Sequence, residues 1–186
     1  HWMVRRQRQM CIRDSTVPKV VTGTCPAVVA IAGHSGTRHS CYRDRGFATL
    51  LAEKGYVTIS TRISQHSVRE QQRTMMGERL WDLIRCVDLL VSRREVDPAR
   101  IGCAGNSLGG EMAMWLAAMD ERIAATMSAG FLTSMDQLEE NHCRCWKFPG
   151  LRELVEFSDI YALTAPRPLM CQNGLQERPT WFTVPL

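Results

Sequence analysis

The sequence predicts a single domain of the α/β class, with a mostly parallel sheet and helices on both of its faces. Short apolar runs rich in β-branched residues alternate with longer segments whose apolar residues recur every three or four positions. The 186 residues are 45% hydrophobic and 23% charged, which is typical of a globular domain. Strands that alternate with helices favour right-handed βαβ crossovers and therefore parallel strands.

The first half of the chain contains four predicted elements. Residues 27–32 form a continuous apolar run, which predicts a strand buried on both faces. Residues 47–54 predict a helix that Gly55 ends, and residues 56–60 predict a second strand. Residues 78–92 have the strongest helical period in the chain, so they predict a helix.

The second half continues the alternation. Residues 100–104 predict a third strand and residues 111–118 a helix, and two further strands are predicted at residues 123–127 and 168–172. Parallel sheets of this kind bind ligands outside the carboxyl ends of their strands. We therefore expect the functional residues directly after the strands.

The first fifteen residues differ from the rest. Residues 5–15 can be encoded by one continuous string that resembles a transposase sequencing adapter translated in frame, so we expect residues 1–15 to be a non-native segment and residues 16–186 to be a partial domain. Residues 1–15 carry four Arg and one Asp, a net +3, which leaves +1 of the total +4 for the rest. We therefore expect no nucleic-acid partner.

Cysteine usage and hydropathy limit the class further. Most of the eight Cys lie singly among apolar neighbours, which is typical of buried free thiols in a reducing compartment and leans towards the cytoplasm. Any signal peptide would precede the printed residues, so localisation stays open. No apolar run approaches the roughly 20 residues that a membrane span needs. Zinc sites usually use two separated ligand pairs, so His142-Cys143-Arg144-Cys145 predicts a structural loop and no metal site.

A nucleophile motif follows the third predicted strand. Gly105-Asn106-Ser107-Leu108-Gly109 is a G-x-S-x-G pattern between a strand and a helix, the setting in which a sharp turn exposes a serine hydroxyl. Gly105 and Gly109 are expected to be small because strand and helix pass close together. The alternative is a glycine-rich turn whose serine only caps the helix.

Acyl transfer also requires donors for an oxyanion and a general base. We expect the backbone N–H groups of Leu108 and His34 to be the donors, with Ser35 as a second candidate for the latter. In this arrangement the acid and then the histidine follow the serine along the chain. Glu177 follows the last predicted strand, but no histidine follows it. We therefore expect the catalytic histidine to lie beyond Leu186, and the domain to be truncated at both ends.

Six segments run in the same order as in α/β-hydrolases related to dienelactone hydrolase and acetyl xylan esterase: PAVVAIAGHSG, LLAEKGYVTIS, LWDLIRCVDLL, EVDPARIGCAGNSLGGEMAMWLAAMDERIAA, NHCRCWKFPGL and DIYALTAPRPLMCQNG. From about Pro26 to Leu186 the chain is most similar to the bacterial group called alpha/beta hydrolase family 7. The resemblance implies an α/β-hydrolase fold and a serine hydrolase that cleaves small-molecule or carbohydrate esters without a cofactor.

By motif, the resemblance implies Ser107 as nucleophile, Leu108 and His34 as oxyanion donors, and Glu177 as the triad acid. Relatives commonly have Asp at the position of Glu177. True dienelactone hydrolases have Cys at the position of Ser107, so the serine favours ordinary ester hydrolysis over lactone opening. Two alternatives stay open: a peptidase or acyltransferase with the same site, and a non-catalytic binding protein with this fold.

Overall fold

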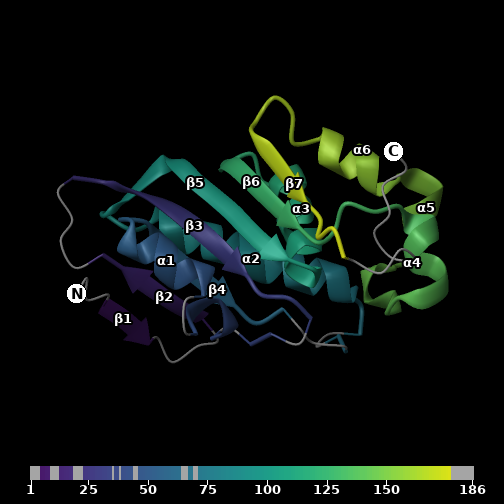
Figure 1. Ribbon diagram of the computed structural model, residues 1–186, viewed down its shortest axis with the longest axis horizontal. Coiled ribbons are helices and arrows are strands. Elements are labelled where there is room, and N and C mark those ends of the chain that lie inside the picture. The colour runs from purple at the N-terminus through teal and green to yellow at the C-terminus, as the bar shows by residue number, and fades with distance from the viewer. Residues whose placement is uncertain are drawn as a thin grey trace.

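The structure is a computed structural model, and it describes residues 5–8, 13–18, 23–34, 36–37, 39–43, 46–63, 67–68 and 71–176. Within these ranges, one sheet has the strand order β1-β2-β4-β3-β5-β6-β7 (Figure 1). The strands are β1 (Arg5–Arg8), β2 (Arg13–Val17), β3 (Cys25–Ile31), β4 (Val57–Thr61), β5 (Val96–Asn106), β6 (Ile123–Ala129) and β7 (Leu169–Gln172).

Five strands, β3 to β7, pair in parallel, as the alternating pattern predicts. β5 is longer than its predicted core because it begins at Val96, whose neighbour Glu95 accepts a hydrogen bond from the backbone of Cys25. β1 and β2 pair antiparallel, and β2 adds them to the sheet beside β4. No strand is predicted for this segment, because its residues were assigned to a non-native origin; that origin stays a prediction.

Helices lie on both faces of the sheet, which confirms the predicted layering. α1 (Phe47–Glu53) covers one face, and α2 (Met75–Val91) and α3 (Leu108–Met119) cover the other. Alternate residues of β3 show the division, since Val29 belongs to the large core with α2 and α3, whereas Ala30 clusters with Ala48 of α1. α2 starts earlier than its predicted bound, because the Thr74 side chain accepts a hydrogen bond from the Gly77 backbone and caps it.

The tryptophans of α2 and α3 differ in burial. The side chain of Trp81 is 53% exposed, whereas that of Trp115 is 6% exposed. The guanidinium of Arg85 lies 4.5 Å above the Trp81 ring, one helical turn away. Trp81 therefore lies on the outer side of α2, where its own helix gives it a partner. Met119, at the end of α3, is 49% exposed.

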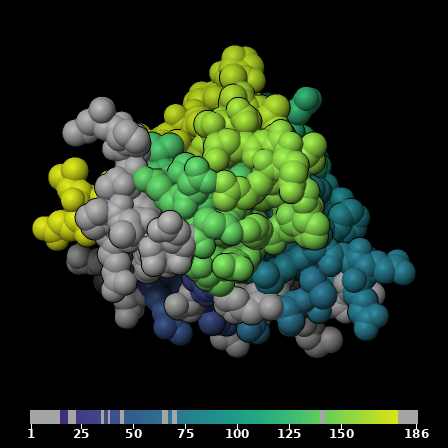
Figure 2. All heavy atoms as spheres, turned by 90° about the vertical axis from the view of Figure 1, so that its right-hand side faces the viewer, coloured from purple at the N-terminus to yellow at the C-terminus, as the bar shows by residue number. Residues whose placement is uncertain are grey.

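Short helices between β6 and β7 form a separate layer over one end of the sheet, drawn in green in Figure 2. They are α4 (Met135–Asn141), η2 (Arg144–Trp146), α5 (Leu151–Leu154) and α6 (Phe157–Ala162); a further short turn, η1 (Ser40–Tyr42), precedes α1. Trp146 and Phe157 are fully buried, with ring centroids 5.5 Å apart. Glu156 accepts a hydrogen bond from the Met135 backbone at 2.8 Å and so ties α6 to α4.

Candidate active site

Ser107 lies at the sharp turn between β5 and α3. Its backbone has φ 58° and ψ −123°, and among the described residues it is the only non-glycine with a positive φ. Such a conformation costs about 1–3 kcal/mol and persists only where the surroundings impose it. The half-buried serine is therefore held by its neighbours in a conformation that the turn, and not its own preference, dictates.

Two close approaches impose this turn. A Cβ at Gly105 would lie 2.2 Å from the carbonyl oxygen of Gly109, and a Cβ at Gly109 would lie 2.2 Å from that of Ile31 in β3. The backbone N–H of Ser107 also donates to the Ala129 carbonyl at 2.8 Å, which fixes the turn to the end of β6. Strand, turn and helix thus meet with no room for side chains at either glycine.

The loop after β3 lies directly against this turn. A Cβ at Gly33 would lie 3.0 Å from the Asn106 carbonyl oxygen and 3.6 Å from Cβ of Ser107. His34 is the next residue, so its backbone is carried beside the serine. On the other side, Leu108 is the first residue of α3, and the first N–H groups of a helix have no intrahelical acceptor. Ser35 lies outside the described residues.

The predicted acid, Glu177, also lies outside the described residues. The segment that leads to it is held by a side chain that the motifs do not reveal. Asn173 accepts a hydrogen bond from the Leu132 backbone N–H at 3.2 Å and donates one to the Leu132 carbonyl at 2.8 Å. Together with the bond from Gly130 N–H to the Gln172 carbonyl, this pairing fixes the end of β7 beside the end of β6.

Two buried charged residues lie beneath the turn. Glu111, in the first turn of α3, is 1% exposed, and Arg79 of α2 is 0% exposed. Burial raises the pKa of the Glu111 carboxyl to about 8, against the opposing effect of the Arg79 charge. Neither residue was singled out from the sequence. A charged residue inside an otherwise apolar helix is the signal that could have identified Glu111.

The loop of residues 142–145, which the sequence predicts to be structural, contacts the loop after β3. Cys145 is 5% exposed, and its Sγ lies 3.9 Å from both ring nitrogens of His34. Arg79 donates a hydrogen bond from Nη1 to the Cys145 carbonyl at 3.1 Å. Burial first, and then the neighbouring Cys143 and Glu111, raise the pKa of the Cys145 thiol. The imidazole of His34 therefore faces this loop.

A cavity of about 880 Å³ lies on the α1 face of the sheet, lined by Phe47, Ala104 and Met127 among others. Gly105 and Asn106 border it, but Ser107 is not among its lining residues. The cavity therefore extends along the α1 side of the sheet as far as the residue before Ser107. It marks sheet surface that the described helices leave uncovered.

The parallel sheet, its flanking helices and the strained serine turn together define an α/β-hydrolase. The sequence model of the prolyl oligopeptidase family matches residues 34–154. Since this match spans more than half of the chain, the chain belongs to the prolyl oligopeptidase family.

The candidate hydrolase YtaP of Bacillus subtilis (strain 168) is 28% identical over 198 aligned residues, which cover 88% of this chain and 64% of that protein. A candidate acetyl xylan esterase from Bacteroides fragilis NCTC 9343 superposes with a TM-score of 0.74 at 17% identity, covering 93% of this chain and 63% of that one. A glucuronoyl esterase from Solibacter usitatus superposes with a TM-score of 0.67 at 16% identity, covering 87% of this chain and 58% of that one.

These comparisons confirm the resemblance to the esterase-like α/β-hydrolases. At these identities the solved structures establish the fold. The chain spans less than two thirds of the length of YtaP and of both structural relatives. No helix among the described residues is long and apolar enough to cross a membrane.

Proposed function

We propose that the protein is a serine hydrolase that cleaves carboxylic esters through an acyl-enzyme. The observation that carries the proposal is the positive φ of Ser107 at a turn bordered by the loop after β3. Energy spent on holding a serine in this conformation is typical of functional sites. A structural capping serine would need no such strain, and the Ser107 side chain caps nothing by a hydrogen bond.

In this mechanism Ser107 Oγ attacks the ester carbonyl while a histidine takes its proton. The carbonyl oxygen becomes an oxyanion that accepts hydrogen bonds from the N–H groups of Leu108 and His34, whose backbones flank the serine. The histidine then protonates the leaving alcohol, and water cleaves the acyl-enzyme by the reverse steps. Glu177 would orient the histidine. No cofactor enters any step.

The substrate class rests on chemistry and similarity together. Serine in place of the cysteine of dienelactone hydrolases favours ordinary esters, and two of the structural relatives carry esterase names. An amide substrate is the second candidate, because the matching family is named for oligopeptidases. A panel of acetylated sugars, lactones and peptides distinguishes these classes by relative kcat/KM.

The decisive experiment combines covalent labelling with turnover of p-nitrophenyl acetate. We expect a fluorophosphonate to label one serine, and Ser107→Ala to abolish the label, whereas the exposed Ser92→Ala keeps it. Because no histidine follows His142 in the printed sequence, turnover by these 186 residues should be near background and should rise when the chain is extended to the next histidine. Failure of the extended wild type to take any label would favour the non-catalytic binding protein, and a label that persists in Ser107→Ala would exclude Ser107 as nucleophile.

A further inference from the structure

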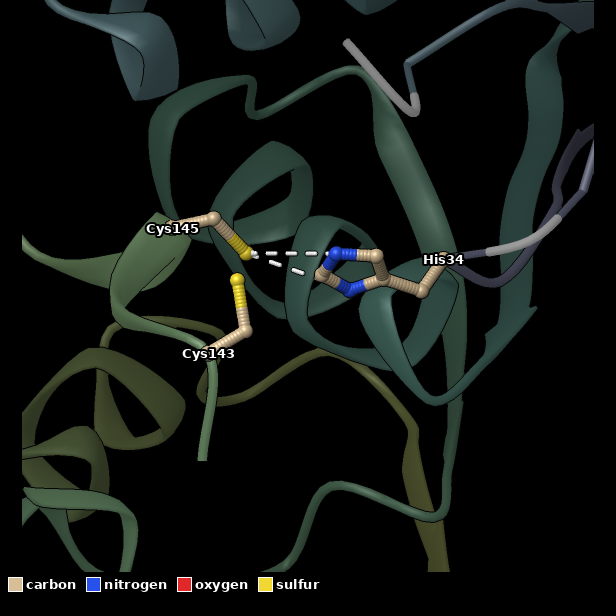
Figure 3. A group of neighbouring side chains, drawn as sticks. All are labelled: His34, Cys143 and Cys145. Carbon is tan, nitrogen blue, oxygen red and sulfur yellow. Dashed lines mark hydrogen bonds between the residues drawn. The ribbon is translucent and has the colours of Figure 1, made fainter. Parts of the chain in front are cut away.

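Three side chains of the types that commonly ligate metals come from distant parts of the chain and meet at the loop after β3. They are His34, Cys143 and Cys145, and their ligand atoms all lie within 4.8 Å of one another (Figure 3). The first of them is separated from Cys145 by 111 positions in sequence. Two cysteines one residue apart do not make a metal site, but a histidine brought to them by the fold supplies the third ligand.

We propose that His34, Cys143 and Cys145 bind one thiophilic cation, with Zn²⁺ as its representative. Zinc bonds of about 2.3 Å to sulfur and 2.0–2.1 Å to nitrogen place tetrahedral ligand atoms about 3.5–3.8 Å apart. Cys145 Sγ already lies 3.9 Å from each ring nitrogen of His34. The ligand atoms, all within 4.8 Å of one another, would have to draw together by up to about 1 Å, and the imidazole would have to turn so that one ring nitrogen points at the ion.

The surroundings suit an ion that enters from solvent. Cys143 is exposed, His34 is half-buried, and Cys145 is buried. The hydrogen bond from Arg79 to the Cys145 carbonyl holds the loop from below, so part of the ordering is completed before any ion arrives. Two thiolates would balance the charge of Zn²⁺, and a neutral imidazole would complete three protein ligands. A fourth position would then be available for water or another small ligand.

The binding step releases protons. Each cysteine loses its thiol proton as its sulfur bonds to the cation, so one Zn²⁺ displaces two protons. The consequence for the protein is mechanical, because His34 follows Gly33, which borders Ser107. A bound ion would anchor the loop after β3 to the loop that carries η2.

Metal binding to the reduced, metal-free chain tests the proposal directly. Calorimetry with Zn²⁺ in buffers of different ionisation enthalpy should give one ion and about two released protons per chain. Co²⁺ in place of zinc should show thiolate-to-cobalt charge-transfer absorption. Loss of an outer-shell partner already weakens metal sites by about 10- to 100-fold, so Cys143→Ser and His34→Ala should each weaken binding by more than about 100-fold.

Cys25→Ser is the matched control, since Cys25 is a half-buried free cysteine at the other end of β3. It should retain wild-type affinity. Absence of stoichiometric binding, or undiminished affinity in Cys143→Ser and His34→Ala, would overturn the proposal. Cys143 is exposed, so its replacement does not disturb the core, and circular dichroism verifies the fold of each variant. None of these readouts depends on the reactivity of Ser107, so the test is independent of the proposed esterase function.

Discussion

The two faces of the sheet are packed differently, although both are apolar. On the closed face, beneath α2 and α3, one row of paired residues crosses four parallel strands, and only its member on the edge strand β7 is exposed. The exposed fractions along the row are 0% for Val29, 3% for Cys103, 7% for Thr126 and 37% for Leu169. Ser107 is held at the end of this buried region, where β5 meets α3. Close packing here leaves the turn no alternative conformation.

The adjacent row lies on the face covered by α1, the open face, and the exposure of its residues increases from β3 to β7. Ala30 is 0% exposed beneath α1, Ala104 and Met127 are half-buried, and Met170 on β7 is 59% exposed. The 880 Å³ cavity lies along this face. Apolar residues therefore determine where the strands lie, whereas the burial of each strand depends on the helices and loops that pack over it.

Replacement of Gly109 should destabilise the protein more than any other substitution on the closed face. Gly109→Ala places a Cβ 2.2 Å from the Ile31 carbonyl oxygen, and backbone atoms of a central strand cannot move aside cheaply. We expect a loss of about 3 kcal/mol or more in the free energy of unfolding, together with loss of fluorophosphonate labelling. Urea denaturation followed by circular dichroism measures the first. A variant as stable as the wild type would show that α3 and β3 are not in fixed contact.

The buried carboxyl of Glu111 makes the stability of the closed face depend on pH. Its folded pKa of about 8 lies above the ordinary value of 4.5, so the folded chain binds this proton more tightly than the unfolded chain does. The resulting stability is complete below about pH 4.5 and is lost as the pH rises to about 8, at no more than about 1.4 kcal/mol per pH unit. Glu111→Gln should remove this slope and be the more stable protein above pH 8. Thermal melts across this range that run parallel for both proteins would contradict the burial of an unsolvated carboxyl.

The closed region was also the most predictable from sequence. The turn at Ser107 is encoded by five consecutive residues, 105–109, and its two glycines indicate directly that strand and helix pass too close for side chains. The long α2 was equally evident, because seventeen residues give a helical period room to repeat. Both features are local, so a single stretch of sequence contains the whole signal.

The remaining features depend on contacts between distant residues. His34 reaches Cys145 across 111 positions, and Arg79 reaches the same residue across 66. The short helices α4 to α6 have too few turns to show a period, and one of them spans four residues. β1 and β2 were missed because their residues were set aside on grounds of origin, which says nothing about backbone pairing.

The smallest expected effect is at the open face, where methionine provides a matched pair. Met112 of α3 is 0% exposed and Met170 of β7 is 59% exposed, so the same replacement probes both faces. Met112→Ala should lower the free energy of unfolding by about 2–5 kcal/mol because it leaves a cavity, whereas Met170→Ala should change it by less than about 0.5 kcal/mol. Chemical denaturation measures both values under one condition. A cost for Met170→Ala close to that for Met112→Ala would mean that a segment outside the described residues covers β7, and the contrast between the faces would then disappear.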